Sequence, residues 1–415
     1  MVKKICMIGL GYIGLPTAGM FASHGVNVVG VDVNPVVVET INSGKIHIVE
    51  SGLADLIKKV VDDGKLQASL IPEEADAFLI AVPTPFKENT KDENPIPDLK
   101  FVESAIRNIA PFLKKGNIVI IESTSPVGTT HKMADILAKI RPDLTFPQDT
   151  GDTADINIAY CPERVIPSKT LQELVSNSRS IGGISRMCAK KASDLYKIFV
   201  EADCILTTAK IAEMVKLAEN SFRDVNIAFA NELSMICDDL DISVWDVIKL
   251  ANRHPRVDIL QAGAGVGGHC IAVDPWFIVD SAPQKSRLIK CAREVNNSKP
   301  DWVVEKVREA VSAHKSTNPN IICLGLAFKA NVDDLRESPA LQITQTLIDT
   351  VGNVAVVEPN ISKLPADLNC DLLTLDEAIQ KGDIFVLLVE HREFIEVGKS
   401  LFKGKIVVDT KGIIS

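Results

Sequence analysis

The chain has 415 residues, more than one hydrophobic core usually serves, so we expect two or three domains. Its composition, 46% hydrophobic and 24% charged, is ordinary for a globular protein. Its net charge of -9 and its lack of a long basic run argue against nucleic-acid binding, although a few Lys and Arg side chains can still hold a phosphate. The apolar run at residues 5–10 is too short for a secretion signal, and none reaches the roughly 20 residues that span a bilayer. We therefore expect a cytoplasmic protein without a membrane partner.

The first part of the chain alternates strand-like and helix-like segments. Apolar runs at residues 5–8, 26–31, 77–82 and 118–121 predict strands, and the amphipathic segments between them predict helices. Such alternation predicts a parallel sheet covered by helices on both faces, which is the doubly wound α/β class.

A glycine loop, Gly9-Leu-Gly11-Tyr-Ile-Gly14, joins the first strand to the first helix, and Asp32 follows the second strand. This is the context of a dinucleotide-binding fingerprint: one glycine for the turn, one for close approach of the pyrophosphate, and one for helix packing. The Asp32 carboxylate would accept hydrogen bonds from ribose hydroxyls and repel a 2′-phosphate, which favours NAD over NADP. The alternative is a glycine turn in a fold that holds no cofactor.

Two turns follow later strands of the same predicted sheet. One contains Thr84 and the other, Glu122-Ser-Thr-Ser-Pro-Val-Gly128, contains Thr124. Ligands of open α/β sheets lie beyond the carboxyl ends of the strands, so both threonines are candidate contacts. Each could equally be an ordinary turn residue.

Residues 209–239 lack Pro and Gly and repeat apolar side chains at helical spacing, which predicts one long helix or a pair. Lys216, Asn220 and Arg223 would share one face of it. Such a face is often merely solvated, but an amine, an amide and a guanidinium also suit proton transfer, oxyanion stabilisation and phosphate binding. We expect more helix up to about residue 315.

The opening pattern then returns. Runs at residues 320–324, 354–357, 384–389 and 406–408 predict strands, and Glu358 follows the second of them as Asp32 does in the first part. We predict a second doubly wound domain that distantly repeats the first. Its glycine loop is degraded, so we do not expect it to hold a dinucleotide in the same way.

The segment from Gly263 to Cys270 contains four glycines within six residues. Such a backbone can wrap closely around a ligand and should leave Cys270 near the surface of a cleft. A thiolate adds readily to an aldehyde and leaves readily from an acyl group, so Cys270 is a candidate nucleophile. The alternatives are a structural cysteine, or a metal site with His269, but no second ligand pair has suitable spacing and we expect no metal.

Six motifs, in this order, resemble the UDP-glucose/GDP-mannose dehydrogenase family from end to end. They are the glycine loop, the Thr124 turn, Cys161-Pro-Glu-Arg164, the Lys216/Asn220 helix, Gly267-Gly-His-Cys270 with Asp274, and Gly325-Leu-Ala-Phe-Lys329 with Asp334-Leu-Arg336. Residues 251–257 and 265–277 are most like members that act on UDP-N-acetyl-D-mannosamine. Ile271-Ala-Val273 replaces a Leu-Pro-Lys segment of the UDP-glucose members, so the lysine of those relatives is absent.

The resemblance implies NAD-dependent, four-electron oxidation of the sugar C6 hydroxymethyl to a carboxylate for polysaccharide biosynthesis, by a homodimer with sites completed across the interface. It implies three domains: an NAD domain at 1–205, a helical dimerisation domain carrying the Cys loop at 206–315, and a UDP-sugar domain at 316–415. The implied catalytic residues are Cys270 as nucleophile, Lys216 with Asn220 for the alcohol proton and the oxyanion, Asp274 to assist them, and Glu163 and Thr124 to orient water.

The implied NAD contacts are Gly9, Gly11, Tyr12, Ile13, Gly14, Asp32, Thr84, Thr124 and Arg336. The implied UDP-sugar contacts are Lys216 and Asn220 again with Arg164, Val165, Arg223, Gly267, Phe328, Lys329 and Lys411, and His254 and Arg256 from the partner subunit.

Three alternatives stay open. The sugar nucleotide could be UDP-N-acetylglucosamine, UDP-glucose or GDP-mannose. A two-electron hydroxyacid dehydrogenase would share the first domain but leave the Cys270 loop unexplained. A catalytically silent nucleotide-binding protein would not need Cys270, Lys216 and Asp32 together.

Overall fold

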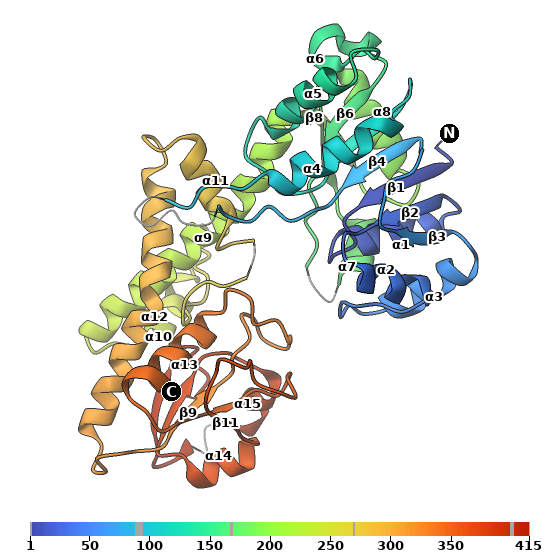
Figure 1. Ribbon diagram of the computed structural model, residues 1–415. Helices are drawn as coiled ribbons and strands as arrows, with labels where there is room; N and C mark the ends of the chain where they lie inside the picture. The colour runs from blue at the N-terminus through green and yellow to red at the C-terminus, as the bar shows by residue number, and fades with distance from the viewer. Residues whose placement is uncertain (1, 88–93, 167–168, 269, 399–401, 415) are drawn as a thin grey trace. The chain divides into compact units, whose positions relative to one another are not determined.

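The computed structural model describes residues 2–87, 94–166, 169–268, 270–398 and 402–414. Contacts divide the chain into two compact units (Figure 1). The first comprises Met1–Ala218 with Trp276–Ser281, and the second Glu219–Pro275 with Ala282–Ser415.

The first unit contains an eight-stranded sheet in the order β3-β2-β1-β4-β5-β6-β7-β8. Neighbouring strands are parallel except β6 and β7, which are antiparallel. The strands are β1 Lys4–Ile8, β2 Asn27–Val31, β3 Leu66–Ser69, β4 Ala77–Ile80, β5 Ile118–Ile121, β6 Asn157–Tyr160, β7 Arg179–Gly183 and β8 Cys204–Thr208.

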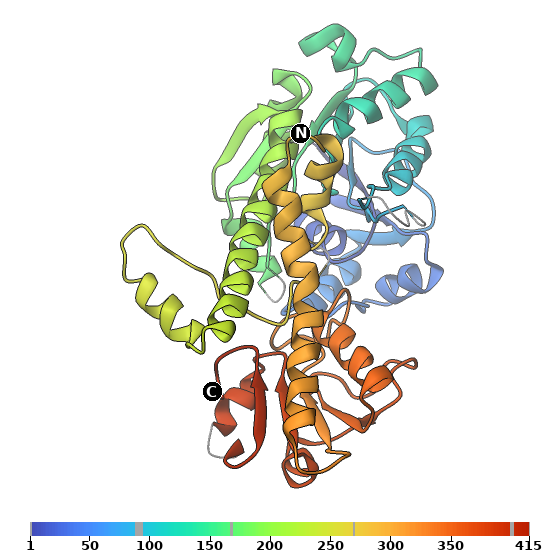
Figure 2. The same cartoon turned by 90° about the vertical axis from the view of Figure 1, so that its left-hand side faces the viewer.

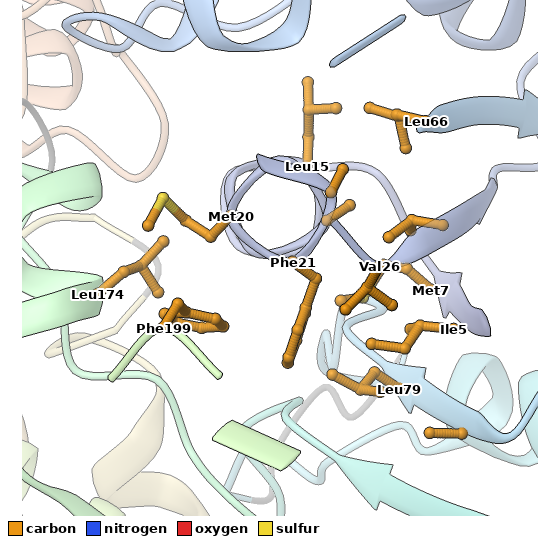
Figure 3. Packing of buried hydrophobic residues seen from close by; sticks show 14 of the residues in the cluster. Ile5, Met7, Leu15, Met20, Phe21, Val26, Leu66, Leu79, Leu174 and Phe199 are labelled. Atoms are coloured by element: carbon orange, nitrogen blue, oxygen red, sulfur yellow. The ribbon is translucent and has the colours of Figure 1, made fainter. Parts of the chain in front are cut away.

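Both faces of this sheet are buried. Ile5 and Met7 of β1 pack into one hydrophobic cluster, and Cys6 and Ile8 pack into another. Figure 3 shows the first cluster around helix α1, where Phe21 lies beside side chains of β1 and β4. Strands buried on both sides must be apolar throughout, which explains the continuous apolar runs.

Helices α1 and α3 contribute to the first cluster and α4 and α5 to the second, so helices cover the two faces of the sheet. The helices of this unit before the long helix are α1 Gly14–Ser23, α2 Pro35–Asn42, α3 Leu53–Asp62, α4 Lys100–Ile109, α5 Thr129–Ile140, α6 Pro147–Thr150, α7 Thr170–Ser176 and α8 Arg186–Tyr196. The doubly wound class is confirmed.

Residues 209–239 form one continuous helix, α9 Ala209–Asp239, and not a pair. From Glu219 onward α9 belongs to the second unit, where α12 runs beside it (Figure 2). The expected further helix is interrupted by irregular chain between α10 Val244–Ala251, α11 Asp274–Ser281 and α12 Arg287–Ala313.

The C-terminal part contains a five-stranded parallel sheet in the order β11-β10-β9-β12-β13. Its strands are β9 Ile321–Leu324, β10 Val354–Val357, β11 Asp371–Leu372, β12 Ile384–Leu387 and β13 Ile406–Asp409. Its helices are α13 Pro339–Thr350, α14 Leu375–Lys381 and α15 Arg392–Val397.

This second sheet repeats the first five strands of the N-terminal sheet in order and direction. Gly9 and Gly325 follow equivalent strands with φ of +94° and +93°, a conformation that glycine adopts without strain. The N–H of Gly9 donates to the carbonyl of Val31 over 2.8 Å, and that of Gly325 to the carbonyl of Val357 over 2.9 Å. The predicted internal repeat is confirmed.

Within the residues that the structure describes, none of the helices combines the length and apolar character needed to cross a bilayer.

Candidate active site

The glycine loop has the geometry of a phosphate cradle. A Cβ on Gly9 would lie 2.5 Å from the carbonyl oxygen of Ala81, and one on Gly14 would lie 1.9 Å from that of Gly9, so both positions exclude side chains. Gly11 instead faces open space, with no atom within 4 Å of an added Cβ. Helix α1 begins after Ile13 without a side-chain cap. The N–H of Leu15 donates to the carbonyl of Gly11 over 3.1 Å and Pro16 has no N–H, so the N–H of Gly14 is the one in the first turn that is left for an anion. These residues fit the pyrophosphate of NAD.

The Asp32 carboxylate is fixed by backbone hydrogen bonds. It accepts the N–H of Leu10 over 3.1 Å and that of Asn34 over 2.9 Å, so the glycine loop and the end of β2 are tied together. Asp32 stays partly exposed, as a group that binds ribose hydroxyls must. Exposed apolar side chains, which the sequence reading did not single out, follow β2 and β3 and suit an adenine ring: Val33, Val36, Leu70 and Ile71.

In the second repeat, the carboxylate that corresponds to Asp32 is that of Glu358, and it is already hydrogen-bonded within the protein. Glu358 accepts the N–H of Leu326 over 2.7 Å and also bonds Nε2 of His391 over 3.0 Å, and both side chains are fully buried. Burial by itself would raise the pKa of Glu358, but its hydrogen bonds to His391 and to backbone N–H groups lower it to about 2. This carboxylate has no exposed face for a ribose.

The Thr124 turn is attached to the long helix by a buried carboxylate. Glu213 of α9 accepts the N–H of Gly128 over 2.6 Å and both the N–H and the hydroxyl of Thr130, over 2.8 and 2.6 Å. A carboxylate at the N-terminus of α5 is favoured by the helix dipole. Burial raises the pKa of Glu213, and these hydrogen bonds oppose the rise. The sequence reading missed this residue.

Lys216 lies one turn after Glu213 on the same helix and is only 8% exposed. Among the described residues, none forms a hydrogen bond or an ion pair with its amine. Most of the Lys216 side chain is shielded from solvent, so the position is not the solvated helix face that was one interpretation of the spacing. Thr84 and Thr124, which follow β4 and β5, are both half-buried.

Glu163 forms a buried ion pair that the sequence reading also missed. Its Oε2 lies 2.9 Å from Nη2 of Arg179, and the two side chains are 5% and 4% exposed. Beside them, Oε1 of Glu122 accepts the hydroxyl of Tyr196 over 2.6 Å. Burial raises the pKa of Glu122 to about 7, although Tyr196 and Arg179 lower it in part.

Arg164 and Val165, both predicted to contact the substrate, are half-buried in the first unit. The guanidinium of Arg164 donates to the carbonyl of Ser178, and Val165 packs at the edge of the first hydrophobic cluster.

In the second unit, three predicted catalytic residues are connected. Cys270 is exposed, as predicted from its glycine loop, and its carbonyl accepts the N–H of Asp274 over 2.9 Å. Asp274 is 3% exposed and begins α11. Its Oδ2 accepts an N–H of Asn220 over 2.5 Å, so the nucleophile's turn is joined to α9. His269 lies outside the described residues.

The same loop packs on the C-terminal domain. A Cβ on Gly267 would lie 2.4 Å from the carbonyl oxygen of Glu337, and one on Gly268 would lie 2.8 Å from the ring of Phe328. Glycine is therefore required where the loop crosses Phe328. Nζ of Lys411 lies 3.2 Å from the position of a Cβ on Gly263 and pairs with Glu390 over 2.6 Å. The structure thus brings Gly267, Phe328 and Lys411 to one loop.

The remaining predicted contacts are exposed side chains of the second unit, and they are Arg223, His254, Arg256, Lys329 and Arg336. Arg336 forms an ion pair with Asp334 over 2.6 Å. Nδ1 of His254 accepts the N–H of Arg256 over 3.3 Å. In the part of the chain that the structure describes, no group of three or more His, Cys, Asp or Glu side chains could hold a metal ion.

Comparison with protein-family models matches almost the whole chain. The NAD binding domain of the UDP-glucose/GDP-mannose dehydrogenase family matches residues 3–200, its central domain residues 210–298, and its UDP binding domain residues 322–415. The chain belongs to this family. It is an NAD-dependent nucleotide-sugar dehydrogenase, and a UDP-binding domain follows the central one.

Similar proteins cover the full length. UDP-N-acetyl-D-mannosamine dehydrogenase of Escherichia coli (strain K12) is 56% identical over 99% of this chain and 98% of that enzyme. NDP-N-acetyl-D-galactosaminuronic acid dehydrogenase of Ralstonia nicotianae is 54% identical over 100% and 96%. The solved UDP-D-ManNAc dehydrogenase from Pyrococcus horikoshii is 39% identical, with a TM-score of 0.89 over 99% of this chain and 96% of that one.

Proposed function

We propose that the enzyme oxidises the C6 hydroxymethyl of UDP-N-acetyl-D-mannosamine to the carboxylate of UDP-N-acetyl-D-mannosaminuronate. The observation that carries the reaction is the exposed Cys270, whose carbonyl accepts the N–H of Asp274, while the Asp274 carboxylate accepts the amide of Asn220. The sugar rests on residues 251–257 and 265–277 and on relatives bearing that name.

The first oxidation needs a base for the alcohol proton. Lys216 is nearly buried and has no partner among the described residues, so in its neutral form it has a free lone pair. Asn220 is the next residue on the same helix face, and its amide N–H can donate to the developing alkoxide. NAD, held at the glycine loop and Asp32, would accept the hydride lost from C6 in each oxidation.

The second oxidation explains the need for a thiol. Hydride leaves from an sp³ carbon that bears a hydroxyl group, and C6 is sp² in the free aldehyde. Addition of the Cys270 thiolate makes C6 sp³ again, as a thiohemiacetal. Oxidation of that adduct forms a thioester. Water then adds to the thioester carbonyl, the C–S bond breaks, and the thiolate is released with the carboxylic acid. The sum is one alcohol, one water and two NAD giving one carboxylate, two NADH and three protons.

We assign water orientation to Glu163 and Thr124, which follow the neighbouring parallel strands β6 and β5. We assign the domains as residues 1–205 for NAD, 206–315 for the helical segment and 316–415 for UDP. The substrate contacts are those predicted above, with Gly267, Phe328 and Lys411 supported by their common loop.

We further propose a homodimer built on α9. Phe222, Phe229 and Ile236 are spaced seven residues apart and are 69%, 54% and 48% exposed. A stripe at this period is what packs helix against helix, and so much apolar surface is rarely left in water. Leu240 and Leu250, 63% and 68% exposed, extend the apolar surface toward residues 251–257. His254 and Arg256 follow Leu250 within six residues, and in the proposed dimer they would extend to the partner's site.

One rival substrate has a specific observation in its favour, because the Ralstonia relative, which is 54% identical, carries the name of an N-acetylgalactosaminuronic acid dehydrogenase. A panel of UDP-N-acetylmannosamine, UDP-N-acetylgalactosamine, UDP-N-acetylglucosamine, UDP-glucose and GDP-mannose, followed by NADH absorbance, tests the assignment. The highest kcat/KM is expected for UDP-N-acetylmannosamine. A higher kcat/KM for another sugar nucleotide overturns the assignment of the sugar and leaves the reaction class in place.

A further inference from the structure

Arg179 carries a buried guanidinium on a strand of the first sheet. It begins β7 and is 4% exposed, and its Nη2 donates to Oε2 of Glu163 over 2.9 Å. Because removing two charges from water is costly, a buried pair persists only where the geometry holds the partners closely. A fold that needed only stability could place apolar side chains here at less cost.

The guanidinium cannot easily shift. Its Cζ lies 4.6 Å from the ring centre of Tyr196 and 5.7 Å from that of Phe199, distances typical of cation–π contacts. The hydroxyl of Tyr196 is itself held by Glu122, over 2.6 Å. Two aromatic rings and one carboxyl group therefore hold the direction in which Arg179 donates to Glu163.

Glu163 is held from its other oxygen as well. Its Oε1 accepts the backbone N–H of Arg164 over 2.7 Å, so each carboxylate oxygen uses one acceptor position and keeps another. Glu163 is 8% exposed to solvent. Such a carboxylate is fixed in place and can still accept a hydrogen bond from one water molecule.

We propose that Arg179 is a positioning residue, which holds Glu163 as the acceptor for the water that hydrolyses the Cys270 thioester. The inference rests on the proposed function, since it needs that thioester. The water oxygen forms a bond to the acyl carbon while Glu163 accepts its proton. The C–S bond breaks, the electron pair leaves with the sulfur, and the proton passes to the thiolate or to solvent.

The proposal makes a selective prediction, because Arg179 acts only after the second oxidation. Arg179→Lys keeps the charge but loses the planar fork that spans Glu163 and the rings. We expect both equivalents of NADH in the first turnover to form at close to the wild-type rate. The steady-state rate should fall at least about tenfold, and the Cys270 acyl adduct should accumulate.

Single-turnover NADH absorbance and the intact mass of the quenched enzyme measure these steps separately. Arg141→Lys is the control for the substitution itself, because Arg141 also pairs with an acid, Asp143, and donates to the carbonyls of Ala110 and Leu113, but lies outside the Glu163 cluster. It should behave like the wild type. Added hydroxylamine, a nucleophile that needs no base, should restore turnover to R179K.

Uniform slowing of every step in R179K, or no acyl adduct, overturns the role of Arg179. Glu163→Asp gives a second test if R179K does not fold, because it keeps the acid and moves it by one methylene. Wild-type hydrolysis in E163D overturns the need for positioning. Glu163→Gln distinguishes a failure of the proposed function from a failure of the positioning role. If E163Q accumulates no acyl adduct, the proposed role of Glu163 itself is refuted. If E163Q accumulates the adduct and R179K does not, only the role of Arg179 is refuted.

Discussion

The amide of Asn220 donates a hydrogen bond to Asp274 over 2.5 Å, and the N–H of Asp274 donates to the carbonyl of Cys270 over 2.9 Å. One buried carboxylate therefore joins the long helix to the turn that carries the nucleophile. A hydrogen bond to an ionised acceptor is stronger than one between neutral groups, and Asp274 is 3% exposed, so little solvent competes for it.

Asn220→Asp should place two acids in contact and destabilise the enzyme, while the exchange N220D/D274N restores one donor and one acceptor. We expect the double variant to recover a coupling free energy of about 1.5 to 3 kcal/mol in urea unfolding. Asn226→Asp, on the same helix but away from Asp274, is the control. Additive effects of the two single changes would show that the hydrogen bond carries no such energy.

Asp32 should decide the cofactor. A carboxylate repels a 2′-phosphate, so kcat/KM should favour NAD over NADP by at least about tenfold, or 1.4 kcal/mol. Asp32→Asn keeps an acceptor for the N–H of Leu10 and removes the charge, so it should narrow the preference without releasing the glycine loop. Asp32→Ala should also narrow the preference for NAD over NADP, and it should weaken NAD binding as well. Equal kcat/KM for the two cofactors in the wild type contradicts this role.

The dimer is tested by complementation. Cys270→Ala and Arg256→Ala are each expected to be nearly inactive, and mixing them under subunit exchange should restore about a quarter of wild-type sites if Arg256 acts on the partner's substrate. Phe229→Glu should give monomers in sedimentation, because it charges the centre of the apolar stripe. Mixed dimers without recovered activity would show that Arg256 does not act in trans.

Glu122 should make stability depend on pH. Its pKa is raised from 4.5 to about 7 in the fold, mainly by burial, so the folded protein binds a proton that the unfolded chain releases. Its favourable contribution is complete below pH 4.5 and is lost as the pH rises through 7. Glu122→Gln stays neutral, so its stability relative to wild type should improve between pH 5 and 8, by on the order of 3 kcal/mol. A difference between the two proteins that is constant with pH contradicts the shift.

The sequence predicted those elements whose own pattern determines them. The limits of β5, β10 and α9 agree with the predicted ranges, because the two strands are apolar runs and α9 is an uninterrupted helical repeat without Pro or Gly. The strand β7 was not predicted. Its residues, Arg179-Ser-Ile-Gly-Gly183, contain a charged residue and two glycines and so lack a strand pattern. The fold accommodates them because Arg179 pairs with Glu163, and because a Cβ on Gly182 would lie 2.6 Å from the carbonyl oxygen of Thr208, where only glycine fits.

The site divides in the same way. Exposure of Cys270 followed from its neighbouring glycines, which are local. Glu213 and Arg179 were missed because their partners, Gly128 and Glu163, are distant in sequence and become neighbours only in the fold. A charged residue within an otherwise small and apolar segment was the one available signal for Arg179. The catalytic roles themselves stay predictions.

Cys270→Ala tests the covalent mechanism most directly, because it removes the adduct and leaves the first oxidation possible. Lys216→Ala is the contrasting variant, since it should slow the first hydride transfer by removing the base. Cys270→Ser is a weaker test, because a serine adduct could stall as an ester with a poorer leaving group.

The decisive measurement is single-turnover NADH absorbance of C270A with mass spectrometry of the enzyme and the sugar product. The covalent mechanism predicts at most one NADH per sugar and a bound aldehyde that a hydroxylamine reagent traps. Two NADH per sugar and the free uronic acid, formed at close to the wild-type rate, would contradict it.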